Sequence, residues 1–92
     1  MATTTFFQAL TVGAWTEIAD GAAIKEVVLQ IASSGPCAVV AKTGAAPAID
    51  ATNYAVVWSV ERSAQIPLGT SDKLYARGLN GDSSVRGWKV SV

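Results

Sequence analysis

The chain has 92 residues, of which half are hydrophobic and only 15% are charged, and its seven basic and seven acidic side chains cancel to a net charge of zero. This length predicts one domain, residues 1–92, with a single core, and the scattered charges exclude the clustered basic surface of a nucleic-acid-binding protein. The absence of histidine excludes Ser–His and Cys–His catalysis, and a single cysteine excludes an intrachain disulfide.

Metal sites, membrane segments and export signals are not expected either. One thiolate without histidine makes a zinc site improbable, and Asp72 and Asp82 lack the dense acidic spacing of a calcium motif. The longest apolar runs have about five residues, whereas a membrane helix needs roughly 20, and residues 1–5 lack the charged start of a signal peptide. We expect no catalytic residues, no cofactor and no membrane partner. The low charge predicts instead a partly apolar surface that a partner covers, unless surface alanines account for it.

Residues 1–10 allow two structures. Three threonines favour extended chain, and the adjacent Phe6 and Phe7 point to opposite faces of a strand, so one ring is exposed unless a neighbouring subunit covers it. We predict partner contacts through Phe6 and Phe7 in an N-terminal arm. The alternative is an ordinary edge strand of the same sandwich.

The next segments predict short strands. Residues 14–18 form a mixed strand, and residues 23–32 form a longer one with a clean apolar face. Residues 37–41 are apolar on both faces, which is typical of a strand that is covered on both sides. We expect this strand to pair with residues 23–32 as a central hairpin, and Cys37 to be a small core residue.

Residues 42–53 break the strand rhythm and form the longest connection. Gly44 and Pro47 argue for a loop and leave a single helical turn as the lesser option. A partner-binding loop and a plain crossover fit this segment equally well. For the first alternative we predict contacts at Lys42, Pro47 and Tyr54.

The last third of the chain, residues 64–92, alternates apolar and polar residues between turns. Asn80-Gly81 is a strong hairpin signal, so residues 74–79 and 85–92 are predicted to pair as a closing hairpin. Together the runs predict an all-β fold, a single small β-sandwich or jelly-roll-like domain of about seven to eight antiparallel strands. A compact barrel is the competing architecture.

Three tryptophans alternate with β-branched neighbours in these segments. We expect Trp58 and Trp88 to lie in the core. The alternative, for these two and Trp15, is a platform of exposed rings that stack on a sugar.

The order of these features resembles small β-sandwich structural proteins encoded among the capsid and tail genes of tailed bacteriophages. The features are a Trp-Thr-Glu-Ile strand, a Val-Val-Leu-Gln-Ile-Ala strand, Gly-Pro before an apolar strand, an Ala-Ala-Pro-Ala loop, and Leu-Tyr-Ala-Arg-Gly-Leu before a Trp-Lys-Val-Ser-Val end. The resemblance spans nearly the whole chain from residue 10.

This resemblance implies a non-enzymatic virion protein, made in the host cytoplasm, that decorates or cements the head. Such a protein binds the lattice of the major capsid protein, often as a homotrimer. The resemblance assigns no particular residues to the contact. The alternative role is a tail or fibre module, or a receptor- or carbohydrate-binding module.

Overall fold

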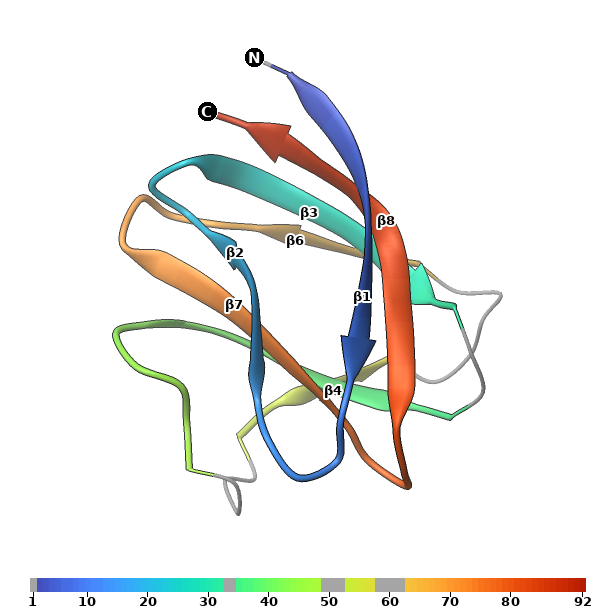
Figure 1. The fold of residues 1–92 in the computed structure, drawn as a ribbon. Helices are drawn as coiled ribbons and strands as arrows, with labels where there is room; N and C mark the ends of the chain where they lie inside the picture. The colour runs from blue at the N-terminus through green and yellow to red at the C-terminus, as the bar shows by residue number, and fades with distance from the viewer. Residues whose placement is uncertain (1, 33–34, 49–52, 58–62) are drawn as a thin grey trace.

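The computed structural model describes residues 2–32, 35–48, 53–57 and 63–92, and these form eight β-strands without a helix (Figure 1). Alternation of apolar and polar side chains, together with many valines, threonines and isoleucines, favours extended chain over helix throughout. The strands are β1 (Thr3–Leu10), β2 (Thr16–Asp20), β3 (Ile24–Ile31), β4 (Cys37–Thr43), β5 (Ala55–Val57), β6 (Ser63–Pro67), β7 (Asp72–Gly78) and β8 (Ser83–Ser91).

The strands form two antiparallel sheets of four. The first sheet has the order β1-β8-β3-β6 and the second has the order β2-β7-β4-β5. Every connection except that between β4 and β5 crosses from one sheet to the other, which is the topology of an eight-stranded jelly roll. The predicted small β-sandwich is therefore confirmed, and two separate sheets replace the barrel alternative.

The core lies between the two sheets. Each strand contributes alternate side chains to it, as the two-residue period of a strand requires. The largest side chains with less than 2% of their surface exposed are Leu10, Val27, Leu29, Ile31, Cys37, Leu74 and Val85. The prediction that Cys37 is a core residue is confirmed.

Both predicted hairpins are wrong. β3 pairs with β6 and β8, whereas β4 pairs with β5 and β7, so these consecutive strands lie in different sheets. The same holds for β7 and β8. At the end of β7 the amides of Gly78 and Leu79 donate to the carbonyl oxygens of Thr11 and Pro36, and so they do not bond to β8. The chain reverses direction at Asn80-Gly81 as predicted, but the turn connects β7 in the second sheet to β8 in the first sheet.

Of the N-terminal segment, Thr3–Leu10 forms an edge strand. β1 pairs with β8 in unbroken register from Thr3–Val90 to Leu10–Ser83, and Leu10 is only 1% exposed. The two ends of the chain lie side by side (Figure 1), where the Ser91 amide donates to the Ala2 carbonyl at 2.7 Å. The N-terminal segment is therefore built into the sandwich.

Two expectations concern residues outside the described ranges. Trp58, predicted as a core residue, is one of them. The second is the single helical turn considered for the long loop, near residues 48–52, because residues 49–52 lie outside the described ranges. In the described part of that loop, residues 44–48 contain no helix.

Candidate functional site

The free edge of β1 differs from the other three sheet edges. β6 contains Pro67, the described part of β5 has three residues, and β2 carries two acidic residues and a register shift after Glu17. Short length, proline, charge and bulges are the devices by which proteins prevent strands from adding to a sheet edge. β1 has eight residues, Thr3–Leu10, and none of these devices. It is the least protected edge among the described strands.

The residues of β1 that present backbone groups at this edge follow from the antiparallel register. Ala2 accepts a hydrogen bond from Ser91, and hydrogen-bonded pairs alternate with non-bonded pairs along an antiparallel ladder. Thr4, Phe6 and Gln8 therefore bond to β8. The N–H and C=O groups of Thr3, Thr5, Phe7 and Ala9 point away from β8 and line the free edge.

Two aromatic rings lie on the outer face of the first sheet, the face turned away from the second sheet. Phe7 is 65% exposed and Trp88 is 46% exposed. Phe7 pairs with Arg86, and Trp88 pairs with Thr5 on one side and Val28 on the other. The prediction that Trp88 is a core residue is wrong, because the core face of β8 carries Val85 instead. The expected division of Phe6 and Phe7 between two faces is confirmed, since Phe6 packs against the core.

A shallow cavity of about 160 Å³ lies beside Trp88 on this outer face. Polar residues from three strands, β3, β6 and β8, line it. The Arg86 Nε donates to Gln30 Oε1 at 3.1 Å, and Ser63 contributes a hydroxyl from β6. The arrangement combines an exposed ring with hydrogen-bonding groups, which suits binding and supplies no nucleophile–base pair.

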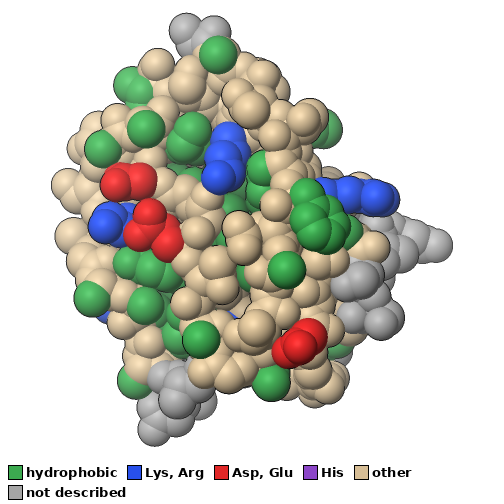
Figure 2. Space-filling model, in the orientation of Figure 1, with side chains coloured by type: hydrophobic (Ala, Val, Ile, Leu, Met, Phe, Trp, Pro, Cys, Tyr) green, Lys and Arg blue, Asp and Glu red, His purple; other side chains and the backbone are tan. Residues whose placement is uncertain are grey.

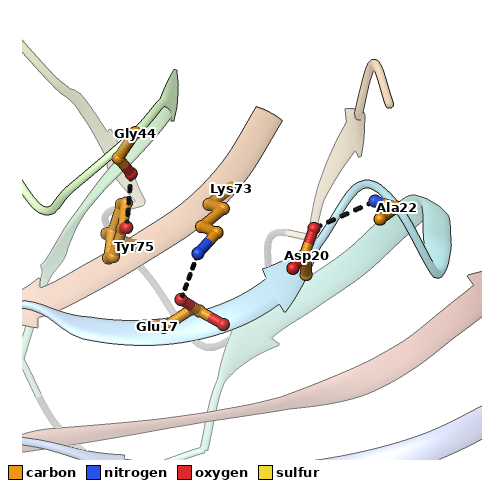
Figure 3. A network of polar contacts seen from close by, with 6 residues as sticks. All are labelled: Glu17, Asp20, Ala22, Gly44, Lys73 and Tyr75. Atoms are coloured by element: carbon orange, nitrogen blue, oxygen red, sulfur yellow. Dashed lines mark hydrogen bonds and ion pairs between the residues drawn. The ribbon is translucent and has the colours of Figure 1, made fainter. Parts of the chain in front are cut away.

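The long β4–β5 loop is fixed onto the outer face of the second sheet. The Tyr75 hydroxyl donates to the Gly44 carbonyl at 2.8 Å, and beside it Lys73 lies 3.6 Å from Glu17 (Figure 3). The Trp15 indole N–H donates to the Ala48 carbonyl at 3.1 Å. The described part of this loop is therefore held by Tyr75 on β7 and by Trp15, which precedes β2.

The five residues predicted to contact partners do not form one site. Phe6 and Phe7 lie on opposite faces of the first sheet. Lys42 pairs with Lys73 within the second sheet, Pro47 is half-buried in the loop, and the Tyr54 ring packs edge-on against Trp15. Phe7 alone combines strong exposure with a position on the free β1 edge.

Sequence reasoning missed the outer-face group of Trp88, Arg86 and Gln30. One signal was present, because strand alternation puts Arg86 on the same face as Trp88 and puts Val85 on the opposite face. A charged residue next to valine in this register indicates which face meets water. Gln30 precedes its partner Arg86 by 56 residues in the sequence. No local pattern indicated that these two residues would meet.

Cys37, the single cysteine, is a buried free thiol. Burial raises the pKa of the Cys37 thiol to about 11, which keeps it protonated at neutral pH. The described residues contain no group of three or more potential metal ligands. On the face that Figure 2 shows, charged side chains are few, and acidic and basic ones adjoin at its left. In the described ranges no helix is long and apolar enough to cross a membrane.

Comparisons of the chain with protein-family models, with curated proteins and with solved structures find no match.

Proposed function

We propose that this chain is a non-enzymatic structural protein of a tailed-bacteriophage particle, a decoration or cement protein that binds the assembled head lattice. The observation that carries the proposal is the unprotected β1 edge with exposed Phe7 beside it. The resemblance described above supplies the particle and the partner, the major capsid protein. The protein would act in the virion as a homo-oligomer, a trimer by that resemblance.

The contact we propose is strand addition. A strand from the lattice pairs with the outward N–H and C=O groups of Thr3, Thr5, Phe7 and Ala9, and main-chain hydrogen bonds supply affinity without any side-chain chemistry. Phe7 then becomes covered, which adds burial of an aromatic ring. Zero net charge means that neighbouring copies meet little repulsion on a crowded shell.

Cementing needs no catalytic step. A protein that binds the assembled lattice and not the separate subunits stabilises the shell by mass action. Each bound copy shifts the equilibrium further toward the intact head. This is the function that an edge strand and an exposed ring can perform.

The test is co-sedimentation with heads that were assembled without this protein. Thr5→Pro removes an N–H that points to the free edge and leaves the β8 ladder intact, so we expect loss of head binding by at least about tenfold. Thr5→Val keeps the N–H and the branched shape and should bind like the unchanged protein. The unfolding temperature of both variants should stay within about 3 °C of the parent.

Gln8→Pro is a check on the register itself. Its N–H bonds to β8, so proline there should destabilise the monomer. Unchanged head binding by a folded Thr5→Pro variant, or no binding of the parent protein to heads, would refute the proposal. Co-sedimentation with purified tails and not with heads would refute the head location.

A further inference from the structure

Trp88 lies on the outer face of the first sheet, among polar side chains of neighbouring strands. Its cross-strand neighbours are Thr5 on β1 and Val28 on β3. Trp88 and Val28 are cross-strand neighbours that form a short apolar strip, and Trp88 is 46% exposed. An exposed indole of this kind offers a flat surface of large area on which a ligand can stack.

Hydrogen-bonding groups lie on both sides of this strip. On β3, Gln30 and Glu26 stand two residues to either side of Val28, at about 7 Å each by strand geometry. The bond from Arg86 occupies Gln30 Oε1 and leaves the Gln30 amide N–H groups to donate. On the other side, Gln65 Nε2 donates to Glu26 Oε2 at 3.0 Å and leaves Gln65 Oε1 to accept. Along the strand direction, groups able to donate therefore lie toward Gln30 and Arg86, and groups able to accept lie toward Glu26.

The cavity beside the ring limits the size of a ligand. Its volume is about 160 Å³, whereas sites for drug-sized molecules occupy about 300–1,000 Å³. The cavity thus accommodates one ring of a ligand and not an extended molecule. The rest of a longer ligand would lie across the open sheet surface.

We propose that this place, the Trp88 subsite, binds a pyranose ring of a neutral glycan. The apolar C–H face of a pyranose stacks on the indole, and its equatorial hydroxyls both donate and accept hydrogen bonds. They match the donors on the Arg86 and Gln30 side and the acceptors on the Glu26 and Gln65 side. This binding activity is separate from the head contact of β1, because the two use different groups.

The charges around the subsite select a neutral sugar. Arg86 stands on one side of the ring and Glu26 on the other, so the formal charges cancel. An acidic sugar would meet the Glu26 carboxylate, and a phosphodiester would need clustered basic residues, which the described residues of this face lack. A ligand with hydroxyls and no charge makes the same hydrogen bonds without either penalty.

The experiment is a titration of the full chain with cellohexaose, maltohexaose, xylohexaose and chitohexaose, followed by ¹H–¹⁵N NMR and calorimetry. We expect at least one of them to bind with a Kd of about 1 mM or tighter. The shifted signals should be the Trp88 indole N–H and the side-chain amides of Gln30 and Gln65. Hexagalacturonate, an acidic oligomer, should bind at least about tenfold more weakly than the best neutral sugar.

Two variants decide whether the ring is responsible. Trp88→Ala should weaken binding at least about tenfold, and Phe7→Ala, which removes the other exposed ring of this face, should bind within about twofold of the parent. No binding of any neutral hexaose at about 10 mM would overturn the proposal. So would binding that survives Trp88→Ala in a folded variant, shifts centred on Trp15, or tighter binding of the acidic oligomer.

Discussion

The guanidinium carbon of Arg77 lies 5.2 Å from the centre of the Trp15 ring. The same cation lies 5.9 Å from the Tyr54 ring, and its Nη1 donates to the Val12 carbonyl at 3.3 Å. Arg77 is on β7, Trp15 precedes β2, and Tyr54 precedes β5. One side chain thus joins two loops to the outer face of the second sheet.

We expect Arg77→Ala to lower the free energy of unfolding by about 2 kcal/mol, because cation–π contacts and a charged hydrogen bond are lost together. Arg77→Lys keeps the charge but not the planar group and should cost about half as much. Urea unfolding measures both values. The control is Arg86→Ala, an exposed arginine with one side-chain partner, which should change stability by less than about 0.5 kcal/mol. Equal effects at the two positions would contradict the joining role of Arg77.

Gly87 fixes the close approach of β8 to β3. It has a φ of 156°, and a Cβ atom there would overlap the Val28 carbonyl oxygen at 1.9 Å. Gly87→Ala should therefore cost more than about 3 kcal/mol or prevent folding, since backbone must move to accept the methyl group. Gly13→Ala is the matched control, because nothing lies within 4 Å of its Cβ position. Thermal unfolding of the pair tests this, and a fully stable Gly87→Ala protein would show that the two strands can separate there.

The sequence pattern was sufficient for the class of fold and for the buried face of residues 23–32. Alternation in residues 23–32 predicted a clean apolar face, and the residues of that face, Val27, Leu29 and Ile31, are all buried. A two-residue period reports which side of a strand is apolar, and this information is local. The division of Phe6 and Phe7 between faces followed from the same rule.

Strand pairing could not be predicted in the same way. Turn residues such as Asn80-Gly81 report a change of direction, but they do not report whether the next strand joins the same sheet. β8 pairs with β1 and β3, whose sequences lie about 50 to 80 residues earlier, so the pairing depends on non-local contacts. That pairing places Gln30 and Arg86 beside the exposed Trp88. The candidate sites therefore could not be predicted from the sequence.

Cys37 should be chemically silent in the folded protein. Burial raises the pKa of its thiol to about 11 from an ordinary value of 9.0, so almost no thiolate exists at pH 8. A disulfide reagent should react slowly with the native protein and rapidly in urea. Fast labelling without denaturant would contradict this burial.

The raised pKa of the Cys37 thiol also predicts an alkaline loss of stability. The unfolded chain releases the thiol proton near pH 9, whereas the folded chain retains it to about 11. Stability from this group is therefore complete below pH 9 and is lost as pH rises toward 11. Cys37→Ala removes the titrating group, so a comparison of the two urea midpoints between pH 8 and 11 isolates the effect. Parallel pH curves for the two proteins would exclude it.

The proposed trimer can be tested by measuring the mass of the protein in solution. Size-exclusion chromatography with light scattering, at tens of micromolar chain, should give the mass of three chains. Low charge and apolar β-strands permit such self-association, and the resemblance to head decoration proteins supplies the number. A monomer would remove the self-association part of the proposal and leave binding to a lattice as the remaining contact.

The last prediction separates the two roles of β1 within one strand. Leu10 is 1% exposed and belongs to the core, whereas Phe7 is 65% exposed on the outer face. Leu10→Ala should lower the free energy of unfolding by about 2–5 kcal/mol because it leaves a cavity. Phe7→Ala should lower it by less than about 1 kcal/mol, because the ring has few contacts to lose.

Head binding should show the reverse order. Phe7→Ala removes the ring that a lattice strand would cover, so we expect weaker co-sedimentation from a protein that unfolds like the parent. Deleting residues 1–10 removes both the edge and Leu10, and cooperative unfolding should be lost along with binding. If that truncated chain unfolds cooperatively at the parent temperature, β1 is a detachable arm. If Phe7→Ala binds heads normally, the lattice contact lies elsewhere on the sandwich.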